Sequence, residues 1–137
     1  MNKLVLRYKF DADDFGGLSL EVVTEHFSGK GSFWVQWQDI IEFAEQLAVD
    51  PIEVENPIVA QWGYDMQEGN DLILRINIAP KNPTGDLTVS VEVADDDEPA
   101  RRLNTSFRSG YAALDLFRRD IVRLMEKKTD EAVLFGY

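Results

Sequence analysis

The segment at residues 72–93, LILRINIAPKNPTGDLTVSVEV, decides the fold of this chain. Apolar side chains alternate with polar ones on both sides of a central turn sequence, and a period of two is typical of strands that bury one face. The linker Lys81–Asp86 supplies the Asn, Pro and Gly that turns favour. Because so short a connection excludes a helical crossover, the segment predicts an antiparallel β-hairpin.

The same alternation recurs on both sides of this hairpin. It predicts further strands at residues 3–10, 18–23, 32–37, 58–64 and 101–107. The first three of these are joined by short connections that contain Gly and Asp, so we expect them to form an antiparallel meander.

Two stretches change from the strand period to the helical period. Each carries apolar residues at spacings of three and four, which form one stripe along an α-helix. The stripes are Ile40, Phe43, Ala44 and Leu47 in the first helix, and Leu114, Phe117, Ile121 and Leu124 in the second. Together these elements predict a single α+β domain over residues 1–137, with a largely antiparallel sheet of about six or seven strands and both helices packed on one face. The apolar tail Glu131–Tyr137 is expected to dock on this body.

The amino-acid composition excludes several classes of function. The net charge is -11, cysteine is absent and His26 is the single histidine. A chain without cysteine has no thiolate nucleophile, and a strongly acidic chain repels phosphate backbones, so nucleic-acid binding is not expected. No apolar run approaches the roughly 18 residues that span a bilayer, so we expect no membrane insertion and a cytoplasmic location.

The acidity is distributed unevenly along the chain. Residues 1–98 carry 20 acidic and 6 basic side chains, a net of -14, and residues 99–137 carry 5 acidic and 8 basic, a net of +3, which sum to -11. Asp39, Glu42 and Glu45 fall away from the apolar stripe of the first helix. The sequence therefore predicts an acidic face around that helix, of the kind that attracts basic partners.

The acidic loops do not match a dedicated metal site. The segment Asp11–Gly16 resembles the start of a calcium-binding loop, but Phe15 and Val22 stand at its fifth and twelfth positions, where oxygen ligands are required. No metal and no cofactor is therefore expected.

No catalytic residue can be assigned from the sequence. The motif Gly29–Ser32 is glycine-rich, but it lacks the spacing of a phosphate-binding loop and no helix is expected after it. We interpret it as a tight hairpin in which glycine supplies positive φ. His26 has no recognisable nucleophile to complete a catalytic triad.

Aromatic side chains predict a binding face. Trp34 points away from its neighbours Phe33 and Val35 on the third strand, while Trp62 and Tyr64 share a face of the fourth. If the helices cover one side of the sheet, Trp34 and one of the other two lie on the open side, where aromatic residues often form interface cores. A curled sheet that buries them in a second core is the alternative.

Several segments carry a resemblance to known proteins. They are residues 27–35 (FSGKGSFWV), 43–47 (FAEQL) and 131–134 (EAVL), together with Tyr111, Leu114 and Phe117. With them the chain resembles a loose group of small uncharacterised bacterial proteins, some of which are suspected immunity proteins of polymorphic toxin systems. The resemblance implies an α+β bacterial protein and allows a toxin-neutralising role, and it carries over no catalytic residue.

The leading hypothesis is a non-enzymatic protein-binding module, an immunity or regulatory factor that recognises a basic partner protein. The residues expected at its interface are Trp34, Trp62, Tyr64, Asp39, Glu42 and Glu45. One alternative is a small hydrolase or small-molecule-binding domain with a pocket between sheet and helices that includes His26 and Arg75. Another is a self-associating structural protein that forms a homodimer through an open sheet face.

Overall fold

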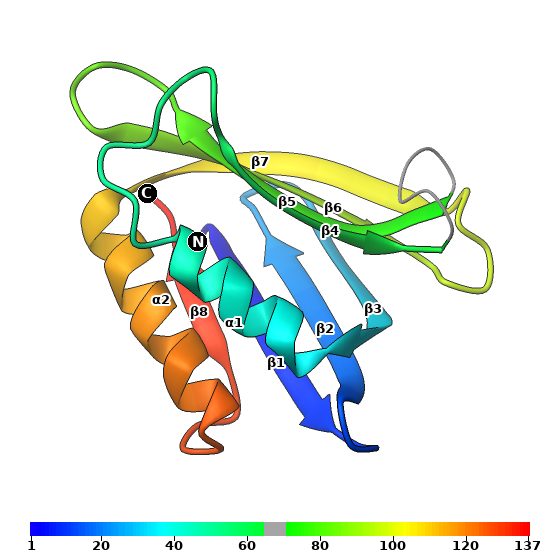
Figure 1. Ribbon diagram of the computed structural model, residues 1–137. Coiled ribbons are helices and arrows are strands. Elements are labelled where there is room, and N and C mark those ends of the chain that lie inside the picture. The colour runs from blue at the N-terminus through cyan, green and yellow to red at the C-terminus, as the bar shows by residue number, and fades with distance from the viewer. Residues whose placement is uncertain (65–70) are drawn as a thin grey trace.

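The computed structural model describes residues 1–64 and 71–137 and is drawn in Figure 1. In chain order its elements are β1 (Lys3–Phe10), β2 (Phe15–Val23), β3 (Ser28–Gln36), α1 (Trp37–Gln46), β4 (Ile58–Gly63), β5 (Leu72–Pro80), β6 (Asp86–Ala94), β7 (Arg102–Gly110), α2 (Tyr111–Met125) and β8 (Ala132–Phe135). Neither helix is long and apolar enough to cross a membrane, within the part of the chain that is described.

The strands form two sheets of four strands each. The first sheet has the order β3-β2-β1-β8 and the second has the order β4-β5-β6-β7. Every pairing within them is antiparallel, which confirms the predicted α+β class and the predicted strand direction. The prediction of one sheet of six or seven strands was wrong.

The division into two sheets follows from the chain between β3 and β4. Helix α1 and residues 47–57 separate the two meanders, so β4 does not extend the first sheet as a hairpin partner of β3. Each meander has an apolar inner face, and the two faces are buried within one hydrophobic core. The predicted docking of the tail is confirmed as β8, whose Leu134 pairs with Leu4 of β1.

The hairpin at residues 72–93 forms as predicted. Ile76 pairs with Val91 and Ile78 pairs with Val89, so their buried side chains share the inner face of the second sheet. In the turn the Asn82 side chain accepts a hydrogen bond from the Thr84 backbone N–H at 3.0 Å. Gly85 follows with φ of 99°, a left-handed conformation that glycine adopts without strain.

Aromatic residues join the helices to the second sheet inside the core. Phe43 of α1 lies edge-on to Trp62 of β4, with ring centroids 6.5 Å apart. Phe43 also meets Phe117 of α2 at 6.3 Å. In Figure 1, α1 and α2 run side by side below the second sheet. The predicted apolar stripes of both helices are therefore the surfaces that bury them.

The glycine motif at the start of β3 has a different role from the one predicted. The turn between β2 and β3 is made by Thr24–Phe27, where the Thr24 hydroxyl accepts the Phe27 backbone N–H at 3.1 Å. Gly31 lies within β3, and a Cβ there would come within 3.0 Å of the Ala94 carbonyl oxygen. Glycine at this position permits close approach of β3 to β6, so the interpretation as a hairpin was wrong.

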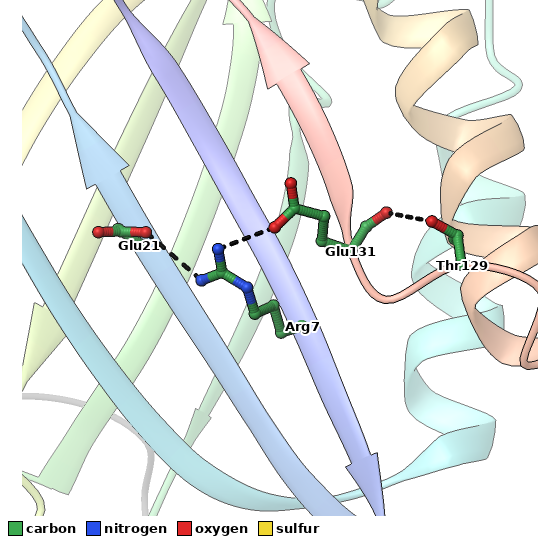
Figure 2. Close-up of polar contacts among 4 residues, drawn as sticks. All are labelled: Arg7, Glu21, Thr129 and Glu131. Carbon is green, nitrogen blue, oxygen red and sulfur yellow. Dashed lines mark hydrogen bonds and ion pairs between the residues drawn. The ribbon is translucent and has the colours of Figure 1, made fainter.

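Figure 2 shows polar contacts that link the start of β8 to β1 and β2 within the first sheet. The Arg7 guanidinium on β1 lies between Glu21 of β2 and Glu131, the residue just before β8, at 3.4 and 2.8 Å. The Thr129 hydroxyl donates to the Glu131 carbonyl oxygen at 3.4 Å. All three charged side chains are partly exposed, so these pairs contribute little energy and mainly orient the strand.

Replacing Tyr8 with phenylalanine is expected to lower the stability of the protein at pH 7. The variant is also expected to lose less stability than the wild type as the pH becomes alkaline. The Tyr8 hydroxyl donates to the Val35 carbonyl at 2.8 Å, a bond worth about 1 kcal/mol. Burial, followed by the negative charge of Asp39, raises the pKa of Tyr8. A raised pKa contributes stability that is complete below the ordinary tyrosine pKa of about 10 and is lost as pH rises through the folded-state value.

Urea unfolding of the wild type and Tyr8→Phe between about pH 7 and 11 measures both effects. Tyr137→Phe is the matched control because this tyrosine is largely exposed. An equally steep alkaline loss of stability in Tyr8→Phe and in the wild type would contradict the role assigned to the Tyr8 proton.

Candidate interaction groove

One side of α1 forms the wall of a groove. The residues of α1 that line it are Asp39, Glu42, Phe43 and Gln46. Their spacing of three, four and seven places them on one side of the helix, where Phe43 also belongs to the stripe that enters the core. This side of the helix extends over roughly 10 Å at 1.5 Å per residue.

The opposite wall is the edge of the second sheet. Residues 59–62 of β4 line the groove without a gap in the sequence. Side chains of consecutive strand residues point to opposite faces of a sheet, so what these four residues share is the backbone edge of the strand. β4 is the outermost strand of its sheet, and α1 runs below it in Figure 1. The volume between these walls, called here the α1–β4 groove, is about 340 Å³.

The α1–β4 groove carries negative charge that the described part of the chain does not compensate. Neither Asp39 nor Glu42 has a basic group of residues 1–64 or 71–137 within 4.0 Å, whereas Glu21, Glu92 and Asp115 each have an arginine partner. Residues 31–74, which contain both walls, include no lysine, arginine or histidine. Asp39 is partly buried and Glu42 is exposed, so both carboxylates are available to a cation that enters the groove.

The predicted interface residues divide among several surfaces. Asp39, Glu42 and Trp62 all line the α1–β4 groove. Trp62 is only 8% exposed, and its ring packs against Phe43 of α1. Glu45 points to the other side of α1.

On that other side lies a second groove, of about 460 Å³, between α1 and α2. Its lining is mainly apolar, from Ile41, Ala44, Val122 and Met125, and Glu45 stands at its margin. Glu45 therefore belongs to the acidic face of α1 but not to the α1–β4 groove.

The other two predicted aromatic residues lie elsewhere. Trp34 is 48% exposed on the outer face of the first sheet and is stacked parallel to Phe15, with ring centroids 6.2 Å apart. Tyr64 is also 48% exposed, and its hydroxyl donates to the Asp96 carbonyl at 3.0 Å. Of Trp62 and Tyr64, it is therefore Tyr64 that is exposed to solvent.

Five lining residues were not among the predicted interface residues: Phe43, which was assigned to the core, and Gln46, Val59, Ala60 and Gln61. Gln46 could have been found from the helical period, because it lies seven residues after Asp39 on the same stripe. The three β4 residues could not, because the edge position of β4 depends on the strand order.

The residues of the alternative pocket are not brought together. Arg75 lines a shallow polar depression of about 220 Å³ with Asn77, Ser90 and Glu92 on the outer face of the second sheet. His26 is exposed in the turn between β2 and β3 and is not part of that lining. The inner faces of both sheets and the stripes of the helices meet in the hydrophobic core.

The acidic loop after β6 brings three carboxylates close together. Ligand oxygens of Asp95, Asp96 and Asp97 lie within 4.8 Å of one another, and all three residues are exposed. The Asp95 side chain already accepts the Asp97 backbone N–H at 2.9 Å. This is a solvated loop, and exposed carboxylates alone do not define a metal site.

Comparison with known proteins gives no family for this chain. No protein-family model matches it, and no curated protein matches it. A function is therefore inferred from the residues of the α1–β4 groove, and the resemblance to immunity proteins stays a prediction.

Proposed function

We propose that this chain is a non-enzymatic binding module that recognises a basic partner protein, as an immunity or regulatory factor. Its contact surface is the acidic face of α1, and Asp39 and Glu42 in the α1–β4 groove are the principal residues. Glu45 extends the negative field to the other side of the helix.

The observation that carries the proposal is the unpaired state of the groove carboxylates in the described residues. A carboxylate that has no partner within its own chain can gain a full charge-assisted hydrogen bond from an incoming lysine or arginine. Complementary charge also raises the rate of association, by factors of about 10 to 10³ at low ionic strength. Both effects favour a cationic partner over a neutral one.

The rigidity of the groove supports the same conclusion. Its walls are a helix and a strand, and Phe43 and Trp62 fix them to each other within the core. A preformed site loses less conformational entropy when it binds than a loop that must be ordered.

Neutralising the groove is expected to reduce partner binding by about tenfold or more, because two charged contacts are lost. The experiment is affinity capture with immobilised wild type and Asp39→Asn/Glu42→Gln, from an extract of the cells that produce the protein. Captured proteins are quantified at ionic strengths of about 0.01 and 0.15 M.

The control removes the same charge elsewhere. Asp95→Asn/Asp96→Asn changes the net charge of the chain equally, in an exposed loop outside the α1–β4 groove. A basic protein that is captured by the wild type and the loop variant, and lost with the groove variant, supports the proposal. Equal capture by all three forms, or no partner of basic character at either ionic strength, contradicts it.

A further inference from the structure

We propose that the α1–β4 groove binds an extended, basic segment of its partner as an additional β-strand on the free edge of β4. This inference rests on the proposed function and specifies its mode of recognition. The occupant is a stretch of polypeptide in strand conformation with lysine or arginine at alternate positions.

The geometry of the two walls favours a strand as occupant. In an antiparallel pair, alternate residues direct their N–H and C=O groups away from the partner strand. β4 pairs with β5 on one side alone among the strands described, so these groups of β4 face the groove. An extended segment can satisfy them and complete a fifth strand of the second sheet.

β4 also lacks the features that protect other edges in this molecule. Edge strands usually carry charges that discourage pairing with another chain. β7 has Arg102 and Arg108, and β3 has Lys30. β8 is uncharged but spans only four residues. The six residues of β4 include no charged side chain.

The acidic wall determines which strands can bind. Side chains of an added strand that point to the inner side of the sheet would face Asp39 and Glu42 on α1. Ala60, on the inner face of β4, leaves space beside them for long side chains. Because strand side chains alternate with period two, the basic residues of the occupant must stand at every second position.

The same charges disfavour a second copy of this chain. Two molecules joined through their β4 edges would bring Asp39 and Glu42 of one close to those of the other, and like charges across an interface are unfavourable. The acidic wall therefore allows a basic partner and opposes self-pairing.

The test uses three synthetic peptides of about eight residues, a usual strand length, in which lysine alternates with threonine. One is unmodified, one is N-methylated at every lysine and one at every threonine. N-methylation removes the backbone donor but keeps the charge. Binding to the intact protein is measured by calorimetry, and exchange of the backbone amides of residues 58–63 by NMR.

Strand addition predicts a difference between the methylated peptides. The donors that face β4 all belong to one alternate set, so one methylated peptide loses affinity by about tenfold or more and the other binds like the unmodified peptide. Alternate amides of β4 become protected when the unmodified peptide binds. Asp39→Asn/Glu42→Gln weakens binding of all peptides that bind.

Other results overturn the inference and separate it from the proposed function. If both methylated peptides bind like the unmodified one and the groove variant weakens all three, recognition uses charge alone and strand addition is wrong. If β4 amides become protected with rising protein concentration in the absence of peptide, the occupant is a second copy. If no peptide binds and the groove variant captures partners like the wild type, the proposed function fails as well.

Discussion

Replacing Phe117 with alanine is expected to lower the free energy of unfolding by about 3–5 kcal/mol, the usual cost of truncating a buried phenylalanine. Phe117 is 0% exposed and meets Phe43 of α1 in the core. The substitution removes the aromatic contact between α1 and α2 and leaves a cavity in the hydrophobic core. Urea unfolding followed by circular dichroism measures the change.

The adjacent residue provides the control. Leu116 lies on the same helix but is 60% exposed, so Leu116→Ala is expected to change stability by less than about 0.5 kcal/mol. If both substitutions cost the same, Phe117 does not have the central position in the core that its contacts indicate.

Replacing Gly31 with valine is expected to lower the free energy of unfolding by about 1–3 kcal/mol or more, because it overpacks the contact between the two sheets. A Cβ at Gly31 would lie 3.0 Å from the Ala94 carbonyl oxygen and 3.1 Å from the Val93 Cβ. Relieving these close contacts requires β3 to move away from β6, and this movement separates the two sheets. The measurement is thermal and urea unfolding of the purified variant.

Gly17→Val is the matched control for this substitution. Gly17 lies in β2, and a Cβ there meets nothing within 4 Å. Valine favours strands more than glycine does, so this variant is expected to be as stable as the wild type or more stable by up to about 1 kcal/mol. Comparable losses in the two variants would show that glycine at position 31 serves the strand itself and not the approach of the sheets.

Local pattern was sufficient to predict most elements of the fold. The stripes of α1 and α2 and the hairpin at residues 72–93 depend on periods that can be read within a few residues. The number of sheets depends instead on which strands meet across long separations. β1 pairs with β8 from the far end of the chain, and no local pattern specifies that partner.

The candidate site also combines a part that local pattern predicts with a part that depends on long-range pairing. The acidic wall of α1 follows from helical spacing and could be predicted, but the wall of β4 follows from strand order and could not. Trp62 and Tyr64 were predicted to share one face. Trp62 is buried against Phe43 of α1, whereas Tyr64 is 48% exposed and lies edge-on to Phe33 of β3. The difference in exposure depends on contacts between the two sheets, which the alternation within β4 does not specify.

The pairing of β1 with β8 also determines how the molecule responds to mechanical load. Lys3 pairs with Phe135, and the Gly136 backbone N–H donates to the Asn2 carbonyl at 2.8 Å, so residues 2 and 136 are neighbours at one end of the ladder. A force that pulls these residues apart acts across the strands and opens one pair at a time. Such unzipping meets less resistance than shearing a whole ladder at once. Under tension β8 would detach from β1 pair by pair, and the hydrogen bonds that join Phe135 and Tyr137 to Ser109 and Arg108 of β7 would bear load as well.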